Sequence, residues 1–276
     1  MFRLNFVFHA IGDQVCTTAV PENLHQATGA RSCITDKRIW AYKYNPYVDH
    51  VEPGDLGNDY YDITLIPDAR IPEQARHYQD SMGCAIAGSQ TEYMLAQLGV
   101  TEPKLRHPRL YIYEDLDIRP NKVVVHTTGS DRTKAGEPAV RPWAGEDDVR
   151  ILSDDILKAI QHNYRDYEIV QVGAATDKPC PGTSQDLRGK LDYWGTAREI
   201  AEAAVFIGVL SGPMHIANCY PRTMKKIVLQ EFPESSVRAW RPGDTRNFSF
   251  TWIDPNSTYY NKFDYDAGIS FSYTKI

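Results

Sequence analysis

The sequence predicts an α/β protein with parallel sheets, because short apolar runs alternate with helical patterns along most of the chain. Ser89-Gln-Thr-Glu92 and Thr196-Ala-Arg-Glu199 have the form of a capping box, and Gly99 stands where the first of these helices should end. The apolar runs are typical of strands and fall at residues 4–8, 32–35, 62–66, 122–126, 168–172, 205–208 and 226–230. Strands that alternate with helices favour parallel sheets covered on both faces.

Residues 101–121 are the best candidate for a domain boundary. This stretch is charged, contains three prolines and separates two series of strands and helices. We therefore expect two Rossmann-like domains, residues 1–110 and residues 111–276. In open α/β sheets, ligands bind beyond the carboxyl ends of the strands, so the loops that follow the strands form the candidate site.

The C-terminal segment has a different pattern. Phe248, Phe250 and Trp252 recur at every second position, and Phe271 and Tyr273 do the same. This alternation predicts β structure or an aromatic-rich C-terminal arm that packs on the body of the protein. A platform for a sugar ring or for a partner subunit is the functional alternative.

Composition excludes several classes of protein. The chain has 276 residues, of which 42% are hydrophobic and 24% charged, as in ordinary globular proteins. Its net charge of −6 argues against a general nucleic-acid binder, which needs clustered Lys and Arg. No apolar run approaches the roughly 20 residues that cross a bilayer. We interpret the apolar N-terminus as the first core strand and not as a signal peptide.

The five cysteines, Cys16, Cys33, Cys84, Cys180 and Cys219, are odd in number and widely spread, with no Cys-x-x-Cys pair. This argues for a reducing compartment and against a structural zinc site. We expect buried, inert thiols and a cytoplasmic protein, located at the inner face of a membrane if its substrate is lipid-linked.

The stretch from Val205 to Cys219 carries the most functional information. It predicts a buried strand, a tight Ser211-Gly212-Pro213 turn and the first turns of a helix. A helix start has orphan N–H donors and partial positive charge, so it suits an anion such as a diphosphate. The alternative is an ordinary strand-to-helix connection.

Further motifs accompany this turn. A strand over residues 4–8 leads to Gly12-Asp13-Gln14, then Cys16-Thr-Thr-Ala-Val-Pro-Glu-Asn-Leu24, and later Tyr44-Asn-Pro-Tyr-Val-Asp-His-Val51. In their order and spacing, these elements and the Ser-Gly-Pro-Met-His turn resemble the heptosyltransferase-type glycosyltransferases of family 9. The resemblance covers most of residues 1–51 and 121–229. It implies a GT-B arrangement of the two domains.

The resemblance also implies an inverting glycosyltransferase. The sugar would move from a nucleotide-diphospho-sugar, ADP-heptose-like by analogy, to a glycan or glycolipid acceptor. Asp13 matches the family's proposed general base, which removes the acceptor proton, whereas the residues alone favour a helix cap. Gly12 precedes it in the Gly-Asp loop and counts among the donor-binding residues.

The other residues implied by the resemblance bind the donor. Hydroxyls and a Lys of the family's "H-x-T-T…K…W" element contact donor phosphates, and Thr127, Thr128 and Lys134 match them best, with Arg132 as a rival for Lys134. Gly173 and Asp177 match a loop whose acidic residue meets the ribose, although a turn or cap role remains open. The diphosphate would lie on the turn itself, formed by Ser211, Gly212, Pro213, Met214 and His215.

Two departures limit the assignment. Leu210 stands where the family usually has Asp before the Ser-Gly-Pro-Met-His turn, which argues against heptose and raises the question of activity. The chain is also shorter than typical members, which argues against a standard lipopolysaccharide inner core as acceptor. A sugar-nucleotide epimerase or hydrolase of GT-B type, or a non-catalytic sugar-nucleotide-binding module, remain alternatives. Asp115-Leu-Asp117 lies in the linker, so together with the GT-B resemblance we expect no metal or other cofactor.

Overall fold

A computed structural model describes the chain in several stretches, to which all statements on structure refer. The described residues are 1–6, 11–34, 39–51, 61–63, 94–95, 97–100, 108–112, 115–129, 151–152, 154–209, 211–217, 219–220, 225–231 and 248–253. The chain divides between Asp115 and Leu116 into two compact units.

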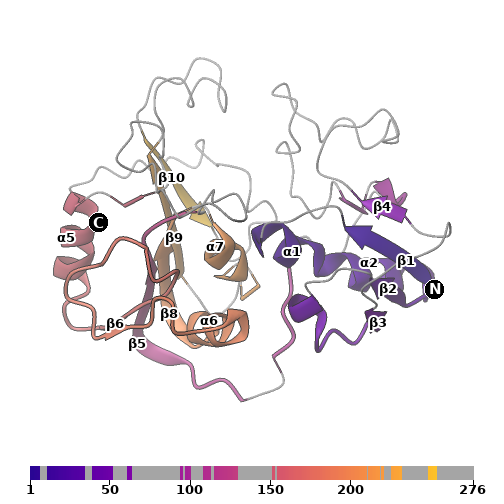
Figure 1. Ribbon diagram of the computed structural model, residues 1–276, viewed down its shortest axis with the longest axis horizontal. Helices are drawn as coiled ribbons and strands as arrows, with labels where there is room; N and C mark the ends of the chain where they lie inside the picture. The colour runs from indigo at the N-terminus through magenta and orange to yellow at the C-terminus, as the bar shows by residue number, and fades with distance from the viewer. Residues whose placement is uncertain are drawn as a thin grey trace. The chain divides into compact units, whose positions relative to one another are not determined.

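The N-terminal unit has a four-stranded sheet whose strand order is β3-β2-β1-β4, and every pairing in it is parallel. Its strands and helices, labelled in Figure 1, are β1 (Phe2–Phe6), α1 (Ile11–Thr17), α2 (Ala19–Thr28), β2 (Ser32–Ile34), the 3-10 helix η1 (Ile39–Tyr42), β3 (Val48–Val51) and β4 (Tyr61–Ile63). The sheet starts at its centre with β1, adds β2 and β3 on one side, and places β4 on the other.

A buried carboxylate anchors α2 to the segment that precedes the boundary. Glu22 is almost fully buried, and both its oxygens accept hydrogen bonds from Nη1 of Arg109. The hydroxyl of Tyr111 donates a further bond of 2.6 Å to Glu22. A buried carboxylate needs such partners, because burial without them carries a large desolvation penalty. The contacts therefore attach residues 109–111 to the N-terminal unit.

The C-terminal unit has a six-stranded sheet of order β10-β9-β8-β5-β6-β7, in which only the pairing of β10 with β9 is antiparallel among the described strands. Its elements are β5 (Arg119–His126), α5 (Asp154–Asn163), β6 (Glu168–Gln171), β7 (Gln185–Asp186), α6 (Tyr193–Ala201), β8 (Ala203–Gly208), α7 (Gly212–Ala217), β9 (Lys225–Glu231) and β10 (Phe248–Ile253).

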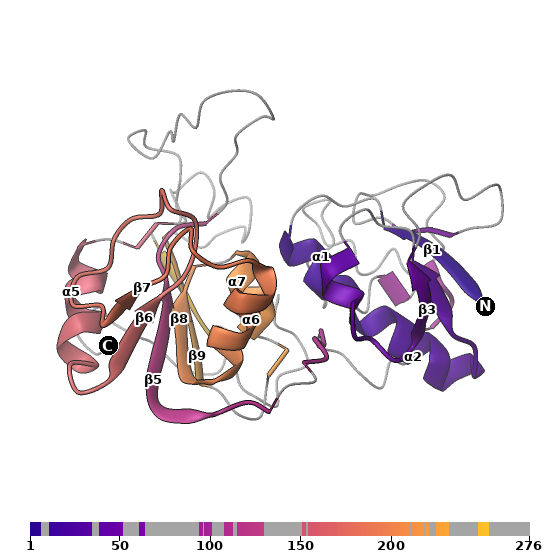
Figure 2. The ribbon, with the colours of Figure 1, turned by 60° about the horizontal axis from the view of Figure 1, so that its bottom comes forward.

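Helices cover both faces of this sheet. Both views show α5 on one face and α6 with α7 on the other (Figures 1 and 2). Val123 and Val125 of β5 belong to a buried cluster that includes Leu157 of α5. Val124 is fully buried too and points to the opposite face, because side chains alternate along a strand. The apolar run of β5 is thus the centre of the sheet.

The start of β5 carries a charged network. Lys122 is fully buried, and its ammonium lies 2.6 Å from Oε2 of Glu199 and 3.6 Å from Glu202. Arg119 lies 2.8 Å from Glu168 of β6 and within 3.7 Å of Glu199. This network ties α6 and β6 to the end of β5 that lies away from its carboxyl end.

The predicted fold class is confirmed as α/β with parallel sheets, and β1, β2, β4, β5, β6, β8 and β9 overlap the predicted strands. The strand β3 was not predicted. The capping box at Thr196 is wrong, because α6 begins at Tyr193 and the side chain of Asp192 caps it by accepting a 2.6 Å bond from the N–H of Gly195. The loop expected at Gly12 is also wrong, since α1 already begins at Ile11.

Two other sequence expectations meet the structure in part. Gly99 has the positive φ of 78° expected of a residue that ends a helix, and the N–H of Val100 bonds back to Leu95. The alternating aromatic residues at 248–252 lie in β10, whereas the remainder of the expected C-terminal arm lies outside the described residues. No helix in the described stretches is long and apolar enough to cross a membrane.

Candidate functional site

The candidate site lies where the strand order of the C-terminal sheet reverses. From β5 the chain adds β6 and β7 on one side and then returns to place β8 on the other side of β5. The loops after β5 and β8 therefore leave the sheet in different directions, and open α/β sheets bind ligands at such a switch point. His126 and Gly208 are paired at the carboxyl ends of these two strands.

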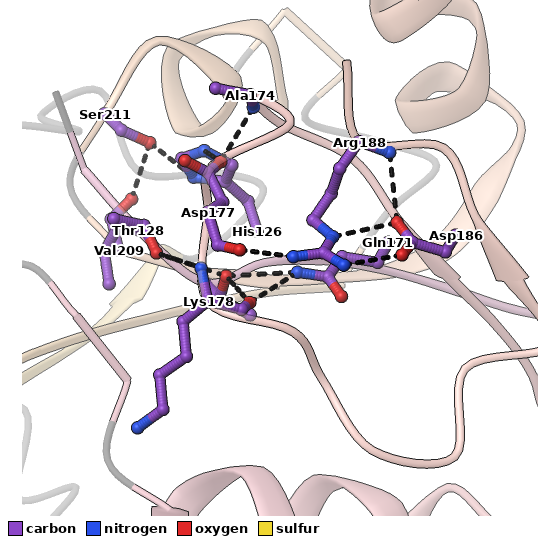
Figure 3. A network of polar contacts seen from close by, with 11 residues as sticks. His126, Thr128, Gln171, Ala174, Asp177, Lys178, Asp186, Arg188, Val209 and Ser211 are labelled. Carbon is purple, nitrogen blue, oxygen red and sulfur yellow. Dashed lines mark hydrogen bonds and ion pairs between the residues drawn. The ribbon is translucent and has the colours of Figure 1, made fainter. Parts of the chain in front are cut away.

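His126 connects two loops at this point (Figure 3). Its Nδ1 lies 2.9 Å from Oγ of Ser211, which follows β8. Its Nε2 lies 3.4 Å from Oδ2 of Asp177, which follows β6. The side chains of His126 and Asp177 are both about 95% buried, at 6% and 5% exposure, whereas Ser211 is partly exposed. A buried histidine and carboxylate thus stand behind one accessible hydroxyl.

The loop after β6 is shaped to bring Asp177 inward. Oδ2 of Asp177 accepts a 2.9 Å hydrogen bond from the N–H of Ala174. Gly173 has a φ of 132°, which only glycine adopts readily, and a Cβ there would lie 2.0 Å from Oδ2 of Asp177 and 3.0 Å from the ring of His126. Gly173 is required at this position because no side chain fits between the loop and the pair.

Buried hydroxyls and an amide hold the other half of this loop. Thr127 donates a 2.6 Å bond to the carbonyl of Lys178 and accepts one from Nε2 of Gln171. Thr128 accepts a 3.0 Å bond from the N–H of Lys178, and Oε1 of Gln171 accepts one from Cys180. These buried polar groups are therefore satisfied within the protein, and they fix the loop against β5.

Arg188 holds the loop from a third side. Its Nη1 donates to the carbonyl oxygen of Asp177, and its Nε and Nη2 donate to the two carboxylate oxygens of Asp186. The hydrogen bonds from this guanidinium lower the pKa of Asp186 to about 2. The pair stays ionised at neutral pH and keeps the loop in one position.

The turn after β8 presents Ser211 at the start of α7. Oγ of Ser211 also lies within hydrogen-bond distance, 3.1 Å, of the carbonyl oxygen of Val209. Gly212 and Pro213 are partly exposed, whereas Met214 and His215 are buried in the protein. Burial lowers the pKa of His215 to about 4, so His215 is neutral at physiological pH. Ser211 is thus the accessible polar side chain of the turn, and His215 is an interior residue.

The structure brings together a subset of the predicted site residues. Thr127, Thr128, Gly173, Asp177 and Ser211 meet at one edge of the sheet, and Gly212, Pro213, Met214 and His215 follow Ser211 in α7. The polar contacts that the structure gives to the two threonine hydroxyls and to Oδ2 of Asp177 are internal to the protein.

The remaining predicted residues are either outside the described residues or part of the N-terminal unit. Arg132, Lys134 and Leu210 lie outside the described residues. Gly12 and Asp13 lie in α1 of the N-terminal unit, where Gly12 is buried and the side chain of Asp13 is outside the described residues.

Sequence reasoning missed His126, Gln171 and Arg188 as members of the cluster. A weak signal existed for two of them, because His126 ends an apolar strand and Gln171 interrupts one. A polar residue at the carboxyl end of a buried strand is expected to contact the loops there. No local pattern signalled that Arg188 reaches the carbonyl of Asp177.

Comparisons with known proteins show what the fold resembles. No family model and no curated protein sequence matches the chain. Among solved structures, it is similar to the iron-containing dodecameric glycosyltransferase TibC from enterotoxigenic Escherichia coli, with a TM-score of 0.55, 15% identity and coverage of 82% of this chain and 59% of TibC. The chain thus spans less than two thirds of the length of TibC. TibC has also been crystallised with ADP-D-β-D-heptose.

Two further structures show the same likeness. A family 9 glycosyltransferase from Veillonella parvula has a TM-score of 0.50 and 16% identity, with 79% of this chain and 78% of that chain covered. The ADP-heptose lipopolysaccharide heptosyltransferase II of E. coli has a TM-score of 0.51 and 12% identity, with 82% and 84% covered. The resemblance to heptosyltransferases and family 9 glycosyltransferases is therefore confirmed at the level of the fold.

The same comparison corrects the expectation that no metal takes part. That expectation rested partly on the GT-B resemblance, and TibC, which shares the fold, is described as iron-containing. The fold therefore does not imply metal independence. The described residues contain no group of three or more His, Cys, Asp or Glu side chains that would hold an ion, so this part of the chain does not fit an iron ion.

Proposed function

We propose that this protein is a glycosyltransferase that moves a sugar from a nucleotide-diphospho-sugar to a glycan or glycolipid acceptor. The observation that carries the proposal is the convergence of His126, at the end of β5, with Asp177 and Ser211, from the loops after β6 and β8, at the switch point of the C-terminal sheet. Nucleotides bind at such points in open α/β sheets, and the fold is one that glycosyltransferases use.

We assign the donor to residues 111–276 and the acceptor to residues 1–110. The loop 173–178 would lie along the nucleotide, with Ser211 and the start of α7 at the diphosphate. The rigidity of the loop supports this assignment, because a site that is fixed in advance does not lose free energy by ordering itself around the ligand. An ADP-linked donor is the first choice by analogy with the ADP-heptose of the similar proteins.

For the transfer step we propose inversion at the sugar carbon, with Asp13 as general base. The carboxylate would take the proton of the acceptor hydroxyl while that oxygen attacks the sugar and the nucleoside diphosphate departs. Negative charge grows on the departing diphosphate, so donors such as the Ser211 hydroxyl and the basic residues Arg132 and Lys134 would stabilise it.

Binding and turnover test the proposal separately. Calorimetry with ADP-, GDP- and UDP-sugars should reveal one preferred nucleotide, and product analysis with glycan and glycolipid extracts should reveal transfer. The variant Asp13→Asn should lower turnover by about 10²–10⁴ while donor affinity stays nearly unchanged. Near-normal turnover of this variant, or an effect on stability alone, would show that Asp13 is not the base.

Other outcomes of the same panel identify the alternatives. Donor binding with no turnover on any acceptor would indicate a binding module, and breakdown of the donor without an acceptor would indicate a hydrolase or epimerase. The absence of binding to every nucleotide-sugar would refute the proposed function.

We also propose a cytoplasmic location, because Cys33, Cys180 and Cys219 are buried free thiols. Intact disulfides in the purified protein would contradict it.

A further inference from the structure

The hydroxyl proton of Ser211 has two acceptors within reach. Oγ of Ser211 lies 2.9 Å from Nδ1 of His126 and 3.1 Å from the carbonyl oxygen of Val209. A hydroxyl carries a single proton, so it donates to one acceptor at a time. The direction of this proton depends on whether Nδ1 of His126 carries a proton of its own.

Asp177 determines the tautomer of neutral His126. Its Oδ2 lies 3.4 Å from Nε2 of His126 and already accepts the N–H of Ala174, as an ionised carboxylate does. A neutral ring therefore keeps its proton on Nε2, facing the carboxylate. The other tautomer would set the lone pair of Nε2 against a buried negative oxygen, which is repulsive at low dielectric.

While His126 is neutral, the hydroxyl of Ser211 is not available to donate a hydrogen bond to a bound anion. Nδ1 of His126 has only a lone pair, so the hydroxyl of Ser211 donates its proton to Nδ1. The oxygen of Ser211 then presents lone pairs outward, and a phosphate oxygen placed there would meet repulsion. If Nδ1 gains a proton, it donates to Oγ, and the hydroxyl proton turns outward. The imidazolium also attracts the anion, while Asp177 balances its charge.

We propose that binding of a nucleotide-diphospho-sugar at Ser211 is coupled to the uptake of one proton from solvent by Nδ1 of His126. The coupling rests on the proposed function, because it requires the diphosphate at Ser211. The proton binds to Nδ1 of His126, and this N–H donates a hydrogen bond to Oγ of Ser211. The hydroxyl of Ser211 keeps its own proton but now donates its hydrogen bond to a phosphate oxygen in place of Nδ1. No covalent bond other than the N–H bond forms, and the charge of the site rises by one to meet the ligand.

The neighbouring charged groups are engaged elsewhere or do not titrate in the same range. Lys178 bonds to the carbonyl of Leu152 and lies 2.8 Å from Asp154. Arg188 contacts the backbone carbonyl of Asp177, and its partner Asp186 stays ionised down to about pH 2. His215, on α7, has a pKa of about 4 and remains neutral above that pH. Within the described part of the chain, His126 is therefore the group expected to take up the proton.

Calorimetry of the full chain with an intact nucleotide-sugar measures the coupling. A diphosphate diester such as that of ADP-glucose, GDP-mannose or UDP-glucose has no proton to exchange near neutral pH, so any proton taken up belongs to the protein. Titrations at one pH in buffers with different ionisation enthalpies give the number of protons. We expect a net uptake of protons on binding, and an affinity that falls as the pH rises, by up to about tenfold per pH unit when one proton is taken up.

Three substitutions separate this role from a structural one. The amide nitrogen of His126→Asn lies near the position of Nδ1 and can donate to Ser211 without titrating, so binding should persist with no proton uptake and little dependence on pH. The amide of His126→Gln lies near Nε2 instead, so binding should be weakened by about tenfold to a hundredfold. Ser211→Ala leaves His126 and Asp177 in place and should weaken binding similarly, with the uptake lost.

The outcomes distinguish the two proposals. If the wild-type protein binds no nucleotide-sugar, the proposed function fails. If it binds one without proton uptake, or if His126→Asn or Ser211→Ala keeps the full uptake, the coupling is refuted while the proposed function stands. Thermal unfolding of each variant shows whether it is folded. Because Ser211 is partly exposed, Ser211→Ala decides the question even if both His126 variants fail to fold.

Discussion

Replacing Gly173 by alanine tests whether the loop after β6 is held in one conformation by the His126–Asp177 pair. The φ of 132° strains any residue with a Cβ by about 1–3 kcal/mol. The added Cβ would also lie 2.0 Å from Oδ2 of Asp177, so the carboxylate must leave the N–H of Ala174. Loss of that charge-assisted bond adds about 1.5–3 kcal/mol. Together these terms predict that Gly173→Ala lowers the free energy of unfolding by about 2.5–6 kcal/mol.

Gly182 supplies the matched control in the same unit. Its φ is 74°, and a Cβ there would meet only the side chain of Gln161, which is exposed and can move aside. Gly182→Ala should therefore lower the free energy of unfolding by about 1–2 kcal/mol, the value for a left-handed backbone alone. Urea unfolding followed by fluorescence compares the two variants, and calorimetry measures their affinity for the preferred nucleotide-sugar. If Gly173→Ala is no less stable than Gly182→Ala and binds as the wild type does, the argument for a fixed loop is wrong.

Three further predictions concern buried groups. The pKa of His215 is about 4 in the folded protein, below its value of about 6.5 in the unfolded chain. The free energy of unfolding should therefore decrease by up to about 3 kcal/mol as the pH falls from about 6.5 to about 4. Urea unfolding of His215→Leu should lack this decrease. Burial raises the pKa of the Cys180 thiol to about 11, so iodoacetamide at about pH 8 should label Cys180 only in the unfolded protein, and rapid native labelling would contradict this. Lys122→Met should lower the free energy of unfolding by about 2–3 kcal/mol. This is less than the usual loss of about 3–5 kcal/mol for breaking a buried ion pair, because Glu199 keeps some contact with solvent and with Arg119. Unchanged urea unfolding would show that the charged network is not needed for stability.

The central strands were predictable from the sequence because their apolar runs are local. Val123-Val-Val125 can only be a buried strand once helices flank it, and the structure places it at the centre of the sheet. The strand β3 was missed, since Val48-Asp-His-Val51 is short and half polar, as edge strands often are. Its pairing with β2 supplies the stabilisation that its own sequence does not indicate.

The start of α6 shows that a capping motif fails as a predictor when another residue nearby can also cap the helix. The capping box at Thr196 satisfies the pattern. Asp192, four residues earlier, is an equally good acceptor, and a helix that starts there is longer.

The burial of Lys122 was not predictable from local sequence either. Nothing near this lysine in the sequence announces that Glu199 and Glu202 will meet it, because its partners are supplied by the pairing of β5 with β8 and the helix that precedes β8.

The candidate site was predictable as a place but not as a set of contacts. The positions of Ser211 and of Asp177 after strands indicated that both belong at one edge of a sheet. The link between them is His126, which lies 85 residues before Ser211 in the chain. Contacts of this kind arise from strand order, and strand order follows from long-range pairing that local patterns do not encode.

The loop after β6 separates the residues that maintain its shape from those that face solvent. Thr127, Thr128, Gln171 and Asp177 direct polar atoms at one another or at backbone, while the side chains of Ala174 and Ala175 are exposed. Small exposed residues at the tip of a loop that is fixed by such contacts are suitable positions for mutagenesis. Under the proposed function, varying these two alanines would alter the surface that faces the nucleotide without disturbing the bonds beneath it. Donor preference would then be able to change by single substitutions, at little risk to the stability of the domain.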